Sequence, residues 1–599
     1  MSGIVGIVNW GGRLVDPRIL WRLTETLRGA GPDGQYVWLG ESVGFGHAAL
    51  RTSREAAAAQ PLSLDGQTWI TADARLDDRA ELVRKLTAHG LDGLRDASDT
   101  ALILHAYRAW GESCVNNLLG DFAFAIWDGP RRRLYCARDH FGVKPLFYAE
   151  GVDWLVFGSS LECVRRYPAV SGGFDDVALG DFLRAGAVQD PTRTAFADIR
   201  RLSSGHCLVG EVGVRAKRYW TLPVDGEIRY RRGAEYVEHF AEVLERAVGD
   251  RVRGRDVGVL MSGGLDSTTV AATARRWLAR EAAPFDLRAY TTVCDRVVPD
   301  PERRYAQLAA DALSLPVHYR VVDDYRPFER WDKPELRRWE PEGDPLLAVH
   351  VDQLSEAASH SRVLLTGHGA DPAVRLPATY AVDLVRAGKI GRLSAELVRY
   401  VVHCRRLPRV RLVTHARRWA GFGPRPAESA PSWLRPEFRD STAPPGPARS
   451  THPVRPHAYE LLTSPDWAQI FETYHPALTG VPVDVRHPFF DRRVVEYLLA
   501  IPPMPWCFDK TVIRLAMRVA LPERVRRRPK TVAAGDPLVA LLREPDARWI
   551  DDFVATPALL RYVDRDRIPR VCGERDPGAI WTNLRPLCLD YWLRSQEAS

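Results

Sequence analysis

The sequence contains very little lysine. Of its 83 basic residues only seven are lysines, so arginine carries nearly all of the positive charge. Such a skew is typical of a GC-rich genome, and the formal net charge of +7 therefore indicates no function by itself. The scarcity does single out each lysine, because a compact ammonium and a planar guanidinium are not interchangeable. The seven are Lys85, Lys144, Lys217, Lys333, Lys389, Lys510 and Lys530.

Paired cysteines and long apolar runs are also missing. The nine cysteines are scattered and none has C-x-x-C spacing, which excludes a disulfide framework and a zinc site. No apolar run approaches the roughly 20 residues that cross a membrane. The first residues have no basic segment, and their apolar run ends at Trp10, so we expect no signal peptide. These absences predict a protein of the reducing cytoplasm that has no membrane contact.

The composition is that of a globular protein of more than one domain. The hydrophobic share is 45% and the charged share 27%, which excludes a disordered or fibrous chain. A chain of 599 residues exceeds what one hydrophobic core usually organises. We therefore expect at least two domains.

Residues 1 to about 220 predict a domain of short strands joined by glycine-rich turns. Alternating apolar residues are the evidence for the strands, and amphipathic helices are expected at Arg18–Arg28 and Asp99–Trp110. The expected strands are Ile4–Asn9, Gln35–Leu39, Val43–Ala48, Trp69–Ala74, Phe122–Trp127, Leu134–Arg138 and Phe147–Tyr148. This pattern favours a layered α+β domain with largely antiparallel sheets.

A second pattern begins near Arg231. We expect an amphipathic helix, a buried strand, a glycine-rich turn, a helix and another strand in that order. Their ranges are Glu235–Val248, Asp256–Met261, Ser262–Ser267, Ser267–Arg280 and Leu287–Val293. Strand, helix and strand form a parallel βαβ unit, so this domain should be α/β at its centre.

Residues 381–450 form a basic segment. It holds 14 Lys and Arg against 5 Asp and Glu, and it is expected to be helical as far as Arg418 and proline-rich beyond Gly421. Two interpretations stay open: a solvated helical face followed by a surface loop, or a docking surface for an anionic or peptide partner. No aromatic-interleaved RNA motif and no helix-turn-helix is present, so nucleic acid is not expected as a partner.

The turn Ser262-Gly263-Gly264-Leu265-Asp266-Ser267 is the clearest candidate site. Glycines let successive N–H groups face one anion, and the following helix adds its positive end. The serine hydroxyls are further donors, and Asp266 is placed to hold Mg²⁺ against phosphate oxygens. The turn is not a Walker A loop, because G-x-x-x-x-G-K-[ST] is absent.

Two further clusters carry chemistry. Thr366-Gly367-His368-Gly369-Ala370-Asp371 follows an apolar strand, Val363–Leu365, and ligands of α/β sheets collect at such strand ends. The other cluster is basic and holds Lys510, Arg514 and the run Arg526–Lys530. A basic run alone is more often surface charge than catalysis.

Together these segments resemble the asparagine synthetase and β-lactam synthetase family over essentially the whole chain. The matching motifs are Gly3–Ile7, Gly31–Asp33, Gly46-His47, Ser98–Thr100, Gly120–Ala125, Arg138–Leu146, Ser262–Ser267, Gly367–Asp371, Arg486–Asp491 and Arg528–Lys530. The resemblance implies a class II glutamine amidotransferase-like domain at 1–220, an α+β sandwich of the Ntn-hydrolase kind. It implies at 221–599 an α/β ATP-pyrophosphatase domain, adenine nucleotide α-hydrolase-like, with helical additions.

The N-terminal domain departs from the family pattern at three places. Glutamine-dependent members begin Met-Cys-Gly, with the cysteine as nucleophile, whereas this chain has Ser2. The family's arginine near Gly46-His47 is matched by Ala49, and its Asn-Gly-Glu by Ala72-Asp73-Ala74. We therefore expect a degenerate glutaminase domain with a structural role, and an attacking amine that comes from the substrate.

The second domain departs at His368. The β-lactam branch resembles Gly-Tyr-Gly-x-Asp; the asparagine branch has Glu in place of that Tyr and a second Glu after the Asp, where this chain has Pro372. A histidine there could accept a proton from an attacking ammonium, or it could merely pack beside the nucleotide.

The resemblance to the lasso peptide cyclases within this family favours ATP-dependent formation of a macrolactam. Such an enzyme adenylates an Asp or Glu side chain of a leader-cleaved precursor peptide, whose N-terminal amine then attacks. The basic segment 381–450, with Trp419 and Trp433, would hold the peptide. A leader-binding protein and a leader peptidase are the implied partners. The alternatives are an amide synthetase for a small carboxylate, either β-lactam synthetase-like or ammonia-dependent, and a non-catalytic scaffold.

The resemblance also implies the site residues. Lys530 matches the family's catalytic lysine, with His368 and Arg514 as further catalytic candidates; Asp266 and Asp371 are the expected Mg²⁺ ligands. The expected ATP contacts are Leu260, Ser262, Gly263, Gly264, Leu265, Asp266, Ser267, Val293, Thr366, Gly367 and Lys510.

Overall fold

The structure is a computed structural model. It describes residues 2–52, 59–280, 284–376, 380–404, 430–439, 452–528 and 535–597. Lys530 and Trp419, together with much of the basic segment, lie outside these ranges. In the described parts of the chain, no helix is long and apolar enough to cross a membrane.

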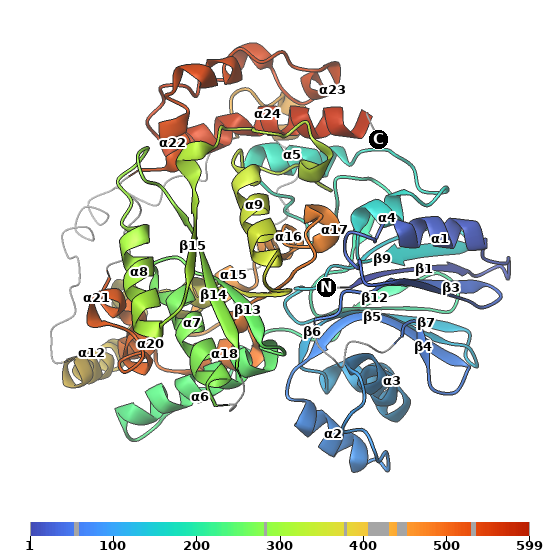
Figure 1. Cartoon of the computed structure of the whole chain (residues 1–599), viewed down its shortest axis with the longest axis horizontal. Helices are drawn as coiled ribbons and strands as arrows, with labels where there is room; N and C mark the ends of the chain where they lie inside the picture. The colour runs from blue at the N-terminus through green and yellow to red at the C-terminus, as the bar shows by residue number, and fades with distance from the viewer. Residues whose placement is uncertain are drawn as a thin grey trace.

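The N-terminal part is a sandwich of two antiparallel sheets (Figure 1). The first sheet has the order β10-β8-β9-β1-β3-β2. Its strands are β1 (Gly3–Asn9), β2 (Gln35–Leu39), β3 (Val43–Ala48), β8 (Phe147–Glu150), β9 (Trp154–Gly158) and β10 (Arg200–Arg201). The second has the order β12-β11-β7-β6-β5-β4. Its strands are β4 (Leu62–Ser63), β5 (Thr68–Leu76), β6 (Gly120–Asp128), β7 (Arg133–Arg138), β11 (His206–Gly210) and β12 (Arg215–Arg218).

Strand periodicity explains the four layers. In β1, Ile4 and Val8 face the second sheet, whereas Val5 and Ile7 face the helices α1 (Pro17–Glu25) and α4 (Leu161–Arg165). In β6, alternate residues divide in the same way between the sheet interface and the layer of α2 (Arg79–Thr87) and α3 (Asp99–Trp110). All seven strands and both helices expected in this region are confirmed, with ends that differ by at most a few residues.

The second part contains a five-stranded parallel sheet of order β15-β14-β13-β16-β17. The strands are β13 (Asp256–Leu260), β14 (Asp286–Val293), β15 (Val317–Val321), β16 (Val363–Leu365) and β17 (Asp484–Arg486). Helices α6 (Gly233–Arg251), α7 (Leu265–Leu278) and α8 (Glu302–Leu313) share one core with the sheet, and α9 (Leu347–Ala358) packs on the other face. The predicted βαβ unit is confirmed, and the carboxyl ends of the strands meet at one edge.

Shorter helices complete the molecule. They are α5 (Asp176–Ala185), α10 (Ala370–Val374), α11 (Tyr380–Arg386), α12 (Ile390–Cys404), α14 (Pro436–Arg439), α15 (Pro456–Leu462), α16 (Asp466–Glu472), α17 (Pro476–Thr479), α18 (Arg492–Ala500), α19 (Pro503–Trp506), α20 (Thr511–Ala516), α21 (Glu523–Arg526), α22 (Pro537–Leu541) and α23 (Pro557–Leu560). The longest helix, α24 (Pro577–Glu597), packs against α5 of the N-terminal part.

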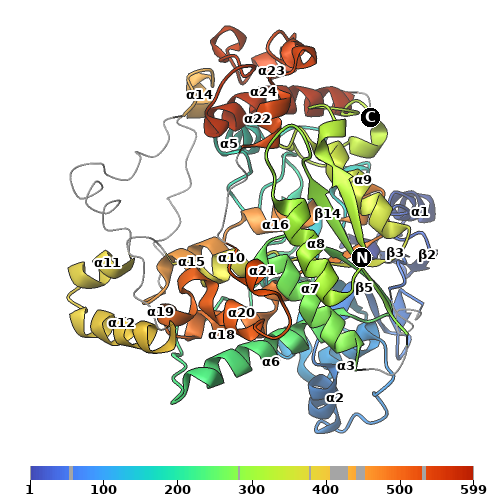
Figure 2. The same cartoon turned by 60° about the vertical axis from the view of Figure 1, so that its left-hand side comes forward.

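The basic segment begins as predicted with helices. Helices α11 and α12 lie at the edge of the molecule beside α19 (Figure 2). Trp433, however, is 1% exposed, and its Nε1 donates to Asn583 on α24 at 2.9 Å. The expectation that Trp433 belongs to a peptide-docking surface is therefore wrong: its large apolar ring packs in the core although basic residues surround it in the sequence.

Buried ion pairs join the two parts at Arg251, the last residue of α6. Its guanidinium lies 3.1 Å from Asp77 and 3.5 Å from Asp121, both from the N-terminal part. It lies 2.7 Å from Asp491, which begins α18. Arg251 is 1% exposed, so water cannot replace these partners.

Replacing Arg251 with methionine should lower the free energy of unfolding by about 3–5 kcal/mol, because three carboxylates then lose a buried counter-charge. Urea unfolding followed by tryptophan fluorescence measures the change. Arg246→Met on the same helix is the matched control: its exposed pair with Glu242 should contribute less than about 1 kcal/mol. Equal losses in the two variants would contradict a special role for the buried cluster.

Candidate active site

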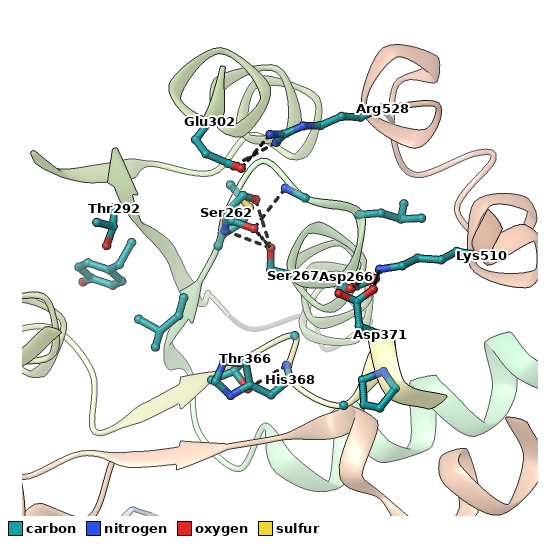
Figure 3. A pocket seen from close by; sticks show the side chains of 18 of the residues that line it. Ser262, Asp266, Ser267, Thr292, Glu302, Thr366, His368, Asp371, Lys510 and Arg528 are labelled. Atoms are coloured by element: carbon teal, nitrogen blue, oxygen red, sulfur yellow. Dashed lines mark hydrogen bonds and ion pairs between the residues drawn. The ribbon is translucent and has the colours of Figure 1, made fainter. Parts of the chain in front are cut away.

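A cavity of about 540 Å³ opens at the carboxyl ends of β13, β14 and β16 (Figure 3). This is the edge where ligands of parallel α/β sheets bind. The turn after β13 forms one wall and the Gly367 turn after β16 forms another, so the two sequence clusters are brought together. Of the predicted nucleotide contacts, Leu260 and Thr366 line the cavity, whereas Val293 is buried and its neighbour Thr292 lines the cavity instead.

Ser267 fixes the turn after β13. Its Oγ accepts from the Ser262 N–H at 3.0 Å and lies 3.1 Å from the Ser262 carbonyl oxygen, to which it can donate. The Gly264 N–H donates to the Ser262 Oγ at 3.2 Å. Helix α7 begins directly afterwards at Leu265, so its positive end faces the cavity. These hydrogen bonds hold the turn rigid, and the first N–H groups of α7 have no acceptor within the helix, so they can bind an anion such as pyrophosphate.

The two turns are in direct contact at Gly367. A Cβ on Gly367 would lie 2.6 Å from the Ser267 nitrogen. No residue other than glycine therefore fits here without moving the Ser262–Ser267 turn, which we call the phosphate turn. Thr366 is held by its own hydrogen bond, since its Oγ1 lies 2.7 Å from His487 Nδ1. These contacts fix the backbone of both turns in the absence of a ligand.

Asp266 and Asp371 converge on one point, as predicted for metal ligands, and Lys510 lies at that point. Lys510 Nζ is 2.5 Å from Asp266 Oδ2 and 2.6 Å from Asp371 Oδ1. Lys510 and its neighbour Asp509 both have left-handed backbones, with φ of 55° and 51°, a strain that aims the ammonium into the cavity.

This arrangement fits Mg²⁺. The described residues hold no cluster of three His, Cys, Asp or Glu side chains that could cage a metal. Mg²⁺ commonly uses only one or two carboxylates together with substrate phosphates, and Asp266 and Asp371 already share one cation between them. The pair therefore suits Mg²⁺ that is completed by the phosphates of a ligand.

His368 lies at the opposite wall from the phosphate turn (Figure 3). Its ring is parallel to His487, with centroids 5.7 Å apart, and Tyr474 and Trp467 flank it. Burial, with repulsion from His350, lowers the pKa of His368 to about 4. At neutral pH the ring is uncharged, and a base with this pKa is poorly matched to removing a proton from an ammonium.

Arg514 lines the cavity, but its guanidinium forms hydrogen bonds with backbone carbonyl oxygens. It donates to the carbonyl oxygen of Arg526 and lies 3.3 Å from that of Arg528. A second bond, from its Nε, reaches the Asp509 carbonyl oxygen at 2.6 Å. Arg514 therefore fixes the chain on both sides of the cavity: the turn of Lys510, and the stretch that leads to the predicted catalytic residue Lys530.

Sequence reasoning missed several residues of this cavity. Glu302, Gln353, Trp467 and Tyr474 line it and belong to no motif. Arg528 was identified only as part of a basic run and of the family motif Arg528–Lys530, with no role of its own. Each is brought in by packing of a distant helix or turn, and a local pattern carries no signal for that.

A second, smaller cavity of about 60 Å³ lies at Ser2. The Ser2 N–H donates to Asp73 Oδ1 at 2.9 Å, and Ser2 Oγ accepts from the Leu50 N–H at 3.2 Å. Lys144 Nζ lies 3.4 Å from Asp73 and 3.0 Å from Asp484 of β17. The substituted residue Asp73 thus places a paired charge in this cavity, which is far smaller than the one at the phosphate turn.

Comparison with known proteins agrees with both halves of the structure. A family model described as asparagine synthase matches residues 239–594, and one described as a glutamine amidotransferase domain matches residues 1–220. Asparagine synthetase [glutamine-hydrolyzing] 2 of Bacillus subtilis is 26% identical over 88% of this chain and 71% of its own length.

Other relatives match a part of the chain. Asparagine synthetase [glutamine-hydrolyzing] 3 of Bacillus subtilis is 33% identical over 46% of this chain, and the chain spans 45% of that relative. Amidase chyE of Penicillium rubens is 26% identical over 46% of the chain and 42% of its own length. A solved glutamine phosphoribosylpyrophosphate amidotransferase from Bacillus subtilis, 15% identical, covers 54% of this chain and 82% of its own with a TM-score of 0.28, too low to carry an argument.

Proposed function

Because the chain belongs to the asparagine synthase family, we propose that it is an ATP-dependent amide synthetase that releases AMP and pyrophosphate. A substrate carboxylate attacks the α-phosphorus of ATP, which gives an acyl-adenylate and pyrophosphate. An amine then attacks the acyl carbon, and AMP leaves. The observation that carries the proposal is the convergence of the phosphate turn, the Gly367 turn and the Asp266–Asp371 pair on one cavity.

The residues that line the cavity have different roles in this reaction. The Ser262–Ser267 turn binds the pyrophosphate part of ATP through its serine hydroxyls and through the first N–H groups of α7, which have no acceptor within the helix. Asp266 and Asp371 would hold Mg²⁺, which neutralises phosphate charge. Lys510 remains within reach of both carboxylates and adds positive charge beside the phosphates. Trp467 and Tyr474 cover the far end, which protects a water-sensitive adenylate.

His368 hydrogen-bonds the attacking amine rather than acting as the base that removes its proton. Its Nδ1 is buried and has no hydrogen-bond partner among the described residues. Since the pKa of the ring is lowered to about 4, the imidazole stays neutral and offers one donor and one acceptor at neutral pH. The proton of the amine then leaves through solvent or the substrate.

We propose further that glutamine does not supply the amine. A serine nucleophile needs an adjacent base, and the nitrogen of Ser2 is already engaged as a donor to Asp73. Ala49 offers no side-chain charge that could pair with the carboxylate of a bound glutamine. The ion pair of Asp73 and Lys144 lies in the cavity at Ser2 instead. The relatives named glutamine-hydrolyzing are similar to this chain in sequence, but the residues that the family resemblance assigns to hydrolysis are replaced here by Ser2, Ala49 and Ala72-Asp73-Ala74.

Ser2→Ala should therefore leave amide formation within about twofold of the unaltered protein, because no step uses the hydroxyl. Amide product formed from ATP, a candidate carboxylic acid and an added amine measures this activity, ATP–pyrophosphate exchange without the amine measures adenylation, and glutamate release from glutamine measures glutaminase. Glutamine hydrolysis that Ser2→Ala abolishes would contradict the structural role of this domain. Absence of exchange with every class of carboxylate would favour the scaffold alternative.

A second candidate is macrolactam formation on a peptide, as in the lasso peptide cyclases. It is favoured by His368, which matches neither small-substrate branch, and by the 14 Lys and Arg of segment 381–450. On this proposal the enzyme adenylates an Asp or Glu side chain of a precursor peptide, and the peptide's N-terminal amine attacks. A leader-binding protein and a leader peptidase would supply that substrate.

Substrate dependence separates the two candidates. Exchange that requires a peptide with a free N-terminus, and a product lighter than that peptide by one water, identifies a cyclase. Exchange with free aspartate or another small acid identifies a small-molecule amide synthetase. A gene for a short precursor peptide beside this one would favour the cyclase.

A further inference from the structure

Glu302, the first residue of α8, places a carboxylate on the phosphate turn. Its Oε2 accepts from the Gly263 N–H at 2.5 Å. The same carboxylate forms a two-pronged pair with Arg528, whose Nη1 and Nη2 lie 3.0 Å and 2.7 Å from its oxygens (Figure 3). A negative group of this chain therefore already uses one of the N–H groups that a pyrophosphate oxygen needs.

Arg528 is held tightly against the turn. Its guanidinium lies 4.5 Å from the Tyr305 ring centroid, and its side chain is 7% exposed. A Cβ on Gly263 would lie 2.7 Å from Arg528 Nη1, so the guanidinium is seated directly on the glycine. A planar guanidinium at this place matches phosphate as well as it matches a carboxylate.

Glu302 and a phosphate oxygen cannot share this place. Two negative groups on one N–H repel each other strongly where little water separates them. The Glu302 side chain is 27% exposed, so it has a path to solvent. Arg528, by contrast, is enclosed and stays behind to meet the incoming anion.

We propose that Glu302 is a positioning residue that occupies the anion position of the phosphate turn while no nucleotide is bound. Arg528 is then a further pyrophosphate-binding residue, which pairs with Glu302 in the empty site and with the nucleotide once it binds. The inference rests on the proposed function, since it assigns residues to the same ATP site. On binding, a phosphate oxygen takes over the Gly263 N–H and the Arg528 guanidinium, and Glu302 turns outward. On release of pyrophosphate, Glu302 returns and displaces it.

Glu302→Gln tests the proposal. Glutamine keeps an acceptor for Gly263 and for Arg528 but removes the competing charge, so the fold is retained. Calorimetry with inorganic pyrophosphate and Mg²⁺ should show about tenfold tighter binding than in the unaltered protein. Arg528→Met should weaken pyrophosphate binding at least about tenfold, and Arg528→Lys by less. Unfolding midpoints of all variants serve as the check on structure.

Asp311→Asn, on the same helix, is the matched control for removing one negative charge, and its pyrophosphate affinity should not change. Unchanged or weaker binding by Glu302→Gln would overturn the inference, because a merely structural ion pair predicts no gain. If the unaltered protein binds neither pyrophosphate nor ATP, the proposed function itself fails. The two failures are therefore distinguishable.

Discussion

Replacing Lys530 with alanine is expected to lower the rate of amide formation by about a thousandfold while the fold survives. The resemblance assigns Lys530 the role of stabilising negative charge on the phosphates and then on the tetrahedral intermediate. Removing one preorganised donor to such a charge costs roughly 10²–10³ in rate. Arg528, two residues earlier in the sequence, lies against the phosphate turn.

Single-turnover formation of product and ATP–pyrophosphate exchange, measured side by side, check this expectation. Lys333→Ala is the matched control: this lysine is 55% exposed, pairs only with its neighbour Asp332 among the contacts described, and should leave both rates unchanged. A rate for Lys530→Ala within tenfold of the unaltered protein would remove Lys530 from the catalytic residues. Loss of product with exchange retained would assign it to the second step alone.

Local patterns predicted the main strands of the sandwich and the βαβ unit of the second part, but none of the helices from α14 to α24. Strands β2 and β3 and helix α3 begin and end at the predicted residues, because each has a clear local signal. In α3 the signal is Ser98, whose side chain accepts from the Ala101 N–H and caps the helix. The phosphate turn was predictable because glycines between an apolar strand and a helix let the backbone approach its neighbours closely: a Cβ on Gly263 would lie 2.5 Å from the Tyr305 Cβ.

Contacts between distant segments were not predictable. Strand β9 lies between β1 and β8 in the first sheet, an order that follows from packing and not from any one strand's sequence. Glu302 and Arg528 are 226 positions apart and form one ion pair at the phosphate turn. Neither residue has a pattern around it that names its partner.

Lys510 is a residue whose role could be predicted from the sequence only in part. Its sequence neighbourhood and the family resemblance predicted a phosphate contact, but its ammonium lies between Asp266 and Asp371. The left-handed backbone at Asp509 and Lys510 decides this direction, and neither residue is a glycine that would announce such a turn. Positive charge near the phosphates was predictable; the two carboxylates that fix it were not.

Removing either carboxylate should affect ATP use severely. Asp371→Asn and Asp266→Asn are each expected to lower ATP–pyrophosphate exchange by about a hundredfold or more, because a neutral amide binds Mg²⁺ weakly and releases Lys510 from one of its two partners. The Mg²⁺ concentration for half-maximal exchange should rise in parallel. Exchange within threefold of the unaltered protein at low Mg²⁺ would exclude the pair as the metal site.

A double-mutant cycle with Lys510→Met separates the two roles of the carboxylates. If Asp371 acts only by holding Lys510, then Asp371→Asn costs nothing once Lys510 has been replaced, and the two losses do not add. If Asp371 also holds Mg²⁺, its loss persists in the Lys510→Met background, and the half-maximal Mg²⁺ concentration still rises. We expect the second result, since Asp266 and Asp371 converge on one cation and Mg²⁺ carries twice the charge of the ammonium that lies there.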